Sequence, residues 1–140
     1  MLRFSANLGF LWTDLLLPEA IDAAAKAGFD AVECHWPFDV PPADVTAALT
    51  AANIPMLGLN TRRGDIDAGD FGIAACPGRE DEARGYIDEA VAYAAKINAA
   101  AVHVMAGRTD QGEKAETAFC TMLSYCLLYT SDAADESSSG

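Results

Sequence analysis

Positively charged residues are scarce in this sequence, and their scarcity limits the partners that the protein can have. Nine Lys and Arg stand against 21 Asp and Glu in 140 residues, which gives a formal net charge of −12 at pH 7. A chain this acidic repels phosphate backbones and anionic lipid headgroups. We therefore expect neither nucleic acid nor a membrane surface as a partner.

Long apolar runs and targeting signals are also missing. No stretch reaches the roughly 18 to 20 uncharged apolar residues that cross a bilayer. Residues 1–7 lack the basic start and the long apolar core of a signal peptide. These absences lead us to expect a cytoplasmic protein. The 51% share of hydrophobic residues is ordinary for a globular chain and excludes disordered and fibrous classes.

The cysteines offer neither a metal site nor a disulfide framework. The four of them, Cys34, Cys76, Cys120 and Cys126, form no CxxC pair. We expect free reduced thiols, because a disulfide framework needs a secreted context. The Asp-rich stretch 65–70 lacks the spacing and the closing Glu of a calcium loop, and no glycine-rich phosphate fingerprint is present. The sequence thus predicts no metal site within this chain.

Short apolar runs alternate four times with Ala-rich amphipathic stretches, a pattern typical of parallel βα units. The predicted strands span 3–8, 31–35, 56–60 and 101–105, and the predicted helices span 18–28, from 42, 80–97 and from about 112. Such alternation leaves a doubly wound sheet or a (β/α)8 barrel as candidates. A closed barrel needs about 250 residues. If the α/β fold is a TIM barrel, four units are only its N-terminal half, with the first and last strands as edges.

The C-terminal residues differ from the rest of the sequence. Residues 126–136 read Cys-Leu-Leu-Tyr-Thr-Ser-Asp-Ala-Ala-Asp-Glu, which resembles the in-frame translation of a transposase-type sequencing adapter and interrupts the helical pattern. We interpret residues 1–125 as a partial barrel domain and residues 126–140 as a non-native, adapter-derived tail. The alternative is an ordinary flexible Ser-rich tail.

Polar residues stand at the predicted carboxyl ends of the four strands, where parallel α/β barrels collect their functional groups. They are Asn7, Glu33, Asn60 and His103. Amides and imidazole suit the hydroxyl and carbonyl groups of a small polar substrate. Structural alternatives remain open, because the asparagines could cap turns, Glu33 could form a salt bridge and His103 could be a satisfied core group.

His103 is the first candidate among these residues. Strand alternation places it opposite Val102 and Val104, towards the barrel interior if the valines pack under the helices. Imidazole at a strand end can contact substrate or assist as a general acid. His35, at the end of the second strand, is a weaker candidate.

The segment 61–79 is too long for a simple connector. It contains Arg62, Arg63 and Arg79, which supply part of the scarce positive charge. We expect these arginines to attract a substrate carboxylate, and we include Arg79 among the substrate-binding residues.

Five motifs, taken in order, resemble the hydroxypyruvate isomerase family over residues 1–125. They are Arg3-Phe-Ser-Ala-Asn-Leu, Ala27-Gly-Phe-Asp-Ala-Val-Glu, Asn60-Thr-Arg-Arg-Gly-Asp-Ile-Asp-Ala-Gly, Pro77-Gly-Arg-Glu and Val102-His-Val-Met-Ala-Gly. The resemblance implies a xylose-isomerase-like TIM barrel and an aldose-ketose type isomerase, an intramolecular oxidoreductase of carbohydrate and glyoxylate metabolism. Family members interconvert hydroxypyruvate and tartronate semialdehyde, or isomerise 2-oxo-tetronates.

The resemblance also implies where the chemistry lies. A divalent metal, Mg or Mn, and two glutamates that carry a proton through an enediol come with later strands of the full-length parent. No catalytic residue is then expected in this chain, which as a 140-residue fragment would bind no metal and be inactive. Its polar strand ends would line the substrate pocket, the loop 61–79 would form a wall or lid, and a homo-oligomer is possible.

Two other functions remain open. One is a 2-oxo-tetronate isomerase of the same family. The other is a non-catalytic half-barrel that closes the barrel by pairing with a copy of itself. Nuclease barrels of the same superfamily are disfavoured by the net charge and by the lack of a basic groove.

Overall fold

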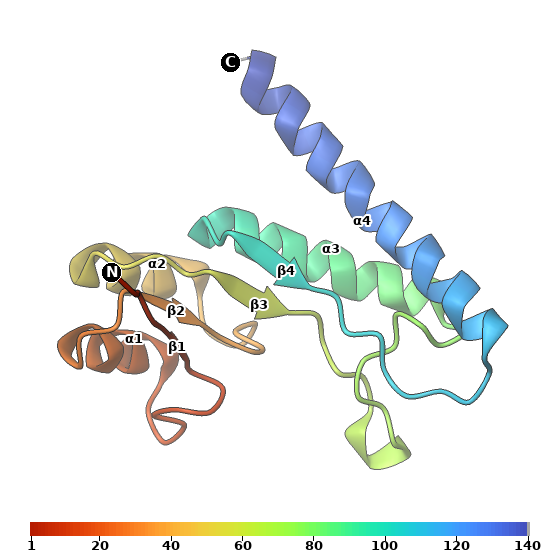
Figure 1. Cartoon of the computed structure of the whole chain (residues 1–140), viewed down its shortest axis with the longest axis horizontal. Helices are drawn as coiled ribbons and strands as arrows, with labels where there is room; N and C mark the ends of the chain where they lie inside the picture. The colour runs from red at the N-terminus through yellow and green to blue at the C-terminus, as the bar shows by residue number, and fades with distance from the viewer. Residues whose placement is uncertain (140) are drawn as a thin grey trace. The chain divides into compact units, whose positions relative to one another are not determined.

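A computed structural model describes the backbone of residues 1–139 and the side chains of residues 1–128 as four successive βα units (Figure 1). The strands are β1 (Ser5–Asn7), β2 (Ala31–Glu33), β3 (Gly58–Asn60) and β4 (Ala101–His103). The helices are α1 (Leu17–Lys26), α2 (Pro42–Ala52), the 3-10 helix η1 (Ile66–Ala68), α3 (Glu80–Ile97) and α4 (Glu113–Ser139). The chain divides into two compact units, residues 1–60 with 92–103 and residues 61–91 with those from 104 onwards.

All four strands belong to the first unit, where they are parallel and neighbour one another in chain order. β1 pairs with β2 and β3 pairs with β4. A bridge between Val32 and Met56 joins β2 to the segment that leads into β3. Within residues 1–139, β1 and β4 therefore each have one paired neighbour, which is the arrangement predicted for strands at the two edges.

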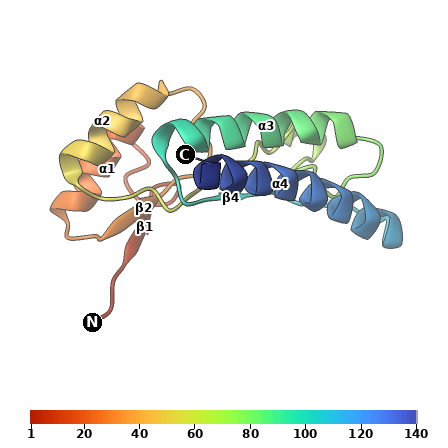
Figure 2. The same cartoon turned by 90° about the horizontal axis from the view of Figure 1, so that it is seen from above.

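Proline at the start of each helix helps to define α1 and α2. Pro18 lies in the first turn of α1 and Pro42 opens α2, positions where the missing N–H has no helical partner to lose. α1 buries Ile21, while α2 buries Val45 and Leu49, which lie four residues apart on one helix face. Figures 1 and 2 both show α1 and α2 side by side. Their apolar faces form much of the core of the first unit.

The second unit has a small core of its own. It is centred on Ile73, Ala83, Ile87 and Met122, each at most 2% exposed. These residues come from the segment before α3, from α3 and from α4, so α4 packs against α3 and the segment that precedes it. Burial of such side chains contributes roughly 1.5 to 3 kcal/mol each.

The predicted element boundaries agree with the structure for some elements and not for others. α3 spans the predicted residues 80–97, whereas each strand ladder is only three residues long. The expectation that the helical pattern ends at Cys126 is wrong, because the backbone of α4 stays helical to Ser139. Residues 126–139 contain neither Pro nor Gly to interrupt a helix. Residue 140 lies outside the described residues, and the origin of residues 126–140 stays a prediction.

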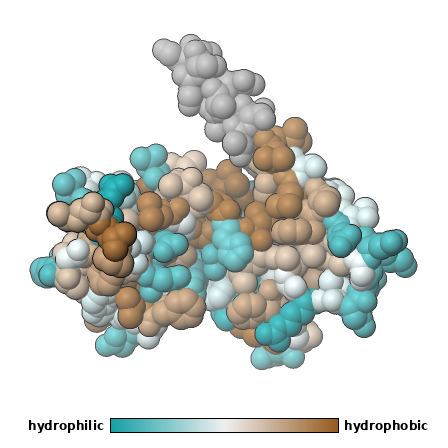
Figure 3. Space-filling view, viewed as in Figure 1, coloured by the Kyte–Doolittle hydropathy of each residue, from teal (hydrophilic) through white to brown (hydrophobic). Residues whose placement is uncertain are grey.

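Large hydrophobic side chains are exposed at the N-terminus and between β1 and α1. They are Met1, Leu2, Phe4, Phe10, Leu11, Leu15 and Leu16. Figure 3 shows hydrophobic residues, in brown, among the hydrophilic ones on the displayed surface. Exposed apolar residues gathered in one part of the chain are typical of surfaces that interact with another apolar surface.

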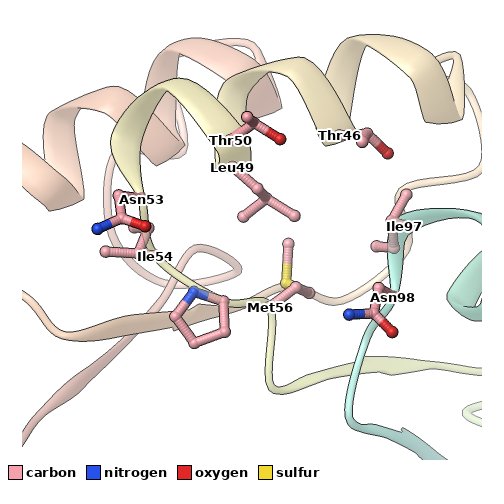
Figure 4. Close-up of a pocket in the computed structure, with 9 residues that line it drawn as sticks. Thr46, Leu49, Thr50, Asn53, Ile54, Met56, Ile97 and Asn98 are labelled. Atoms are coloured by element: carbon pink, nitrogen blue, oxygen red, sulfur yellow. The ribbon is translucent and has the colours of Figure 1, made fainter.

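A hollow of about 370 Å³ lies near the amino ends of β3 and β4, in the first unit (Figure 4). Figure 4 shows Leu49 and Met56 pointing toward one another across it, with Asn53 and Asn98 at its sides. Both asparagines have left-handed backbone, with φ of 54° and 57°, and Asn53 caps the end of α2. In parallel α/β barrels this amino-terminal end is associated with stability, and chemistry occurs at the opposite end.

Candidate functional site

The four polar residues at the strand ends form two register pairs in the first unit. Asn7 lies opposite Glu33 in the β1–β2 ladder, and Asn60 lies opposite His103 in the β3–β4 ladder. Neighbouring strand residues point to the other face, where Ala6, Val32 and Leu59 are each at most 1% exposed beneath the helices. We name Asn7, Glu33, Asn60 and His103 the strand-end row. The structure therefore places all four residues at strand ends, in two pairs, and their role in binding substrate stays a prediction.

Asn7 is fixed by the turn that follows β1. Its side-chain Oδ1 accepts a hydrogen bond from the Gly9 N–H at 2.9 Å, and its carbonyl oxygen accepts from the N–H groups of Phe10 and Leu11 at 3.0 Å each. Asn7 therefore does cap a turn, as the structural alternative held. Since Oδ1 points to Gly9, the amide NH2 is the part of Asn7 suited to a substrate oxygen.

The end of β2 forms backbone hydrogen bonds with the segments on both sides of it, β1 and β3. The Glu33 carbonyl accepts from the Leu8 N–H at 2.8 Å, and the His35 carbonyl accepts from the Asn60 N–H at 2.8 Å. The His35 ring packs edge-on against Phe10 and Trp36, with ring centroids 4.9 and 5.0 Å away. His35 thus lies in an aromatic cluster, while the half-buried Glu33 belongs to the strand-end row.

His103 is exposed at the end of β4, whereas the adjacent Val102 is half-buried. The alternation predicted for this strand is therefore present. The imidazole is not a buried core group, because its side of β4 is open in the described part of the chain. An exposed imidazole can offer one donor and one acceptor to a ligand.

A hollow at the carboxyl ends of β1 and β2 was missed by sequence reasoning. Its volume is about 260 Å³, and Trp12, Trp36 and His35 line it with aliphatic residues from the loops and from α1. Both tryptophans of the chain line this hollow. Aromatic residues shortly after two successive strands were the available signal, and their spacing alone did not indicate a shared cavity.

Arg79, in the second unit, is held by two carboxylates. Its two terminal nitrogens bind the Oδ1 and Oδ2 atoms of Asp70 at 2.7 and 2.8 Å, and its Nε binds Glu82 at 3.0 Å. The hydrogen bonds from Arg79 lower the pKa of Asp70 to about 2 and also lower the pKa of Glu82. The same contacts raise the pKa of the Arg79 guanidinium. This geometry favours a structural role for Arg79 in the loop, and its contact with substrate stays a prediction.

Arg62 is paired in a similar way. Its Nε and one terminal nitrogen bind the two carboxylate oxygens of Glu89 on α3, at 2.6 and 3.0 Å. Two of the three loop arginines therefore neutralise carboxylates of this chain. The sequence did not indicate these internal partners, and the expected attraction of a substrate carboxylate stays a prediction.

Two aspartates of the loop accept hydrogen bonds from backbone N–H groups. Asp65 caps η1 by accepting from the N–H groups of Asp67 and Ala68 at 3.1 and 3.2 Å. Asp70 accepts from the Asp65 N–H at 2.8 Å. Among the described residues, no three His, Cys, Asp or Glu side chains gather where they could hold a metal ion.

A comparison with known families identifies this architecture. The profile of the family described as xylose isomerase-like TIM barrel matches residues 21–135. The chain belongs to this family. Its fold is that of the N-terminal half of a (β/α)8 barrel, as the resemblance of its motifs implied.

Solved and curated relatives agree with this membership in the xylose isomerase-like family. A crystal structure described as AP endonuclease, family 2, from Brucella melitensis superposes with a TM-score of 0.83 at 33% identity, over 90% of this chain and 50% of that one. The hydroxypyruvate isomerase of Escherichia coli is 32% identical over 123 residues, which are 88% of this chain and 48% of that protein. The 2-oxo-tetronate isomerase of Haemophilus influenzae is 35% identical over 116 residues, 83% of this chain and 45% of that protein.

A mouse protein named "Putative hydroxypyruvate isomerase" is 41% identical over 112 residues, which cover 79% of this chain and 40% of that protein. The xylose isomerase-like chain thus spans between two fifths and one half of the length of these curated relatives. No helix among the described residues has the length and apolarity that a membrane crossing requires.

Proposed function

We propose that this chain forms the N-terminal half of a hydroxypyruvate isomerase, and that the 140-residue chain by itself is inactive. The strand-end row supports this proposal, because two amides, a carboxylate and an imidazole stand in two pairs at the end of the strands where barrels of this kind bind substrate. Curated relatives that bear the names of isomerases support it.

The reaction is a proton transfer between two adjacent carbons. A base removes a proton from the hydroxymethyl carbon of hydroxypyruvate, which gives an enediol, and a proton is returned to the former carbonyl carbon. A second proton moves from the hydroxyl oxygen to the former carbonyl oxygen. The product, tartronate semialdehyde, has the same atoms and needs no external oxidant.

The strand-end row would bind and orient the substrate in this scheme. The Asn7 NH2 group and the Asn60 amide donate hydrogen bonds to substrate oxygens, and His103 contacts the oxygen whose proton moves. Glu33 accepts from a substrate hydroxyl. The carboxylates that move the carbon-bound proton would come from strands that follow β4.

A divalent metal, Mg or Mn, accompanies this chemistry in the proposed full-length parent. The described residues do not provide for it, because no three potential ligands gather among them. Glu33 and His103 belong to different strand pairs, beside Asn7 and Asn60 respectively. The roles given above to the residues of this chain are therefore roles in binding.

A 2-oxo-tetronate isomerase is the second candidate function. Relatives of that name, from Haemophilus influenzae and Cupriavidus necator, are 35% and 40% identical to this chain, as similar as those named hydroxypyruvate isomerase. The two substrates share a carboxylate next to a carbonyl. They differ in the carbons beyond it, so the strand-end row serves either one.

The test begins with the source gene, read past the codon for Gly140. If the frame continues into further βα units, the complete protein is assayed for isomerisation of hydroxypyruvate and of a 2-oxo-tetronate. We expect turnover of hydroxypyruvate, reduced at least about tenfold by His103→Ala through lost substrate orientation. A preference of about tenfold or more for the tetronate would favour the second candidate. A stop codon after Gly140 would redirect the question to self-association of a half-barrel.

A further inference from the structure

Thr61 is the one polar residue that is fully buried in the part of the chain with described side chains, at 3% exposure. It follows directly after Asn60, the last residue of β3. Its Oγ1 accepts a hydrogen bond from the Met105 N–H at 2.9 Å, across 44 positions of sequence. Met105 in turn lies two residues after His103 and is 8% exposed. A side chain therefore continues the connection between β3 and β4 beyond the residues where the backbone ladder stops.

After Met105 the backbone hydrogen bonds of this segment go to the loop before α3 and no longer to β3. The carbonyl oxygens of Met105 and Ala106 accept from the N–H groups of Ala74 and Ala75, at 3.1 and 2.8 Å. The Thr61 hydroxyl thus accepts from the Met105 N–H, and the adjacent carbonyls bind the loop segment that precedes α3.

Two glycines allow the segment after β4 to lie directly against the loop before α3. Gly72 and Gly107 both have φ of 96°, and a Cβ on either would collide with the other segment's backbone. The loop segment and the segment after β4 therefore pass in direct backbone contact. A buried hydroxyl in such a place has little freedom to change its partner.

We propose that Thr61 is a positioning residue, which acts through the Met105 amide to fix the ends of β3 and β4 and thereby the register partners Asn60 and His103. The proposal rests on the proposed function of the strand-end row. It assigns the Thr61 hydroxyl no contact with substrate.

Thr61→Val removes the hydroxyl and keeps the shape, whereas Thr61→Ser keeps the hydroxyl. A buried N–H without an acceptor costs about 1 to 3 kcal/mol, so the valine variant should open locally at Met105. Thr117→Val is the control, because the Thr117 hydroxyl also bonds the backbone, here by donating to the Glu113 carbonyl, but lies exposed on α4.

The first measurement is amide hydrogen exchange of Met105 in the 140-residue chain. We expect exchange at least about tenfold faster in Thr61→Val than in the wild type, and unchanged exchange in Thr61→Ser and Thr117→Val. Equal exchange of the Met105 amide in the wild type and Thr61→Val would overturn the proposal.

The second measurement is isomerase turnover of the complete protein. We expect Thr61→Val to lower kcat about tenfold with a smaller change in KM, since misplaced groups lose alignment more than affinity. Thr61→Ser, which keeps the hydroxyl, should retain most of the wild-type kcat. Unaltered kcat in Thr61→Val, with an active wild type, would overturn the positioning role alone. An inactive complete wild type would instead overturn the proposed function, and the positioning role with it, even if the exchange result stood.

Discussion

Arg79 binds both carboxylate oxygens of Asp70, at 2.7 and 2.8 Å, and so joins the start of α3 to the middle of the preceding loop. The Asp70 side chain is 14% exposed and the Arg79 side chain 32%. Two-point contacts between a guanidinium and a carboxylate fix orientation as well as distance. The pair therefore restrains the loop 61–79 in a defined conformation, which favours a wall over a lid.

The Asp70–Arg79 pair should make stability depend on acidic pH. Because the pKa of Asp70 in the folded protein is about 2, below its ordinary value of 3.8, folding favours the ionised carboxyl. The resulting stabilisation is fully present above about pH 4 and is lost as the pH falls from about 4 towards 2. Melting temperatures of the wild type should therefore fall more steeply over this range than those of Asp70→Asn.

Asp81→Asn is the control for this comparison. Asp81 binds Arg84 at 2.9 Å but its side chain is fully exposed, so its removal should leave the pH dependence of the melting temperature unchanged. Melting curves of Asp70→Asn that run parallel to those of the wild type between pH 4 and 2 would contradict the prediction.

Cys34 should resist alkylation in the folded protein. It is 6% exposed, and burial raises the pKa of its thiol to about 12, which lowers the fraction of reactive thiolate about a thousandfold. With iodoacetamide at pH 8, peptide mass mapping should find Cys34 modified at least about tenfold more slowly than the exposed Cys120. The difference should vanish in denaturant. Similar rates for the two thiols in the native protein would rule out the buried placement of Cys34.

Met122 should contribute strongly to the stability of the second unit. Its side chain is fully buried against Ile73, Ile87 and their neighbours, so Met122→Ala removes apolar contacts and leaves a cavity. We expect the free energy of unfolding to fall by about 2 to 5 kcal/mol, as urea titration of the helical circular dichroism would measure. Leu123→Ala, at a neighbouring residue that is 38% exposed, should cost less than about 1 kcal/mol. Equal losses in the two variants would refute this packing of α4.

Local patterns were sufficient to predict the βα order and the strand-end row. Apolar periodicity along residues 80–97 depends only on neighbours in sequence, and so does the alternation that turns His103 away from Val102. Which strands become neighbours follows from the general behaviour of parallel βα units. The βα order and the place of these polar residues at strand ends therefore follow from local sequence patterns.

Side-chain contacts that cross the loops could not be predicted from local sequence patterns. Nothing in the sequence indicates that Asp70 bends back to Arg79, or that Thr61 reaches Met105. These partners depend on the path of the loop, which turns on left-handed glycines and side-chain caps. The sequence shows that arginines stand in this loop, but it does not show that Arg62 and Arg79 form ion pairs with carboxylates of the same chain.

The neighbour order of the parallel strands also has a consequence for biosynthesis. β1 pairs with β2, β2 is bridged to the segment before β3, and β3 pairs with β4, so the order across the sheet is the order of translation. Each strand therefore meets its neighbour already outside the ribosome, and folding can keep pace with elongation. In a barrel assembled like this, only ring closure requires the first strand to wait for a partner made much later.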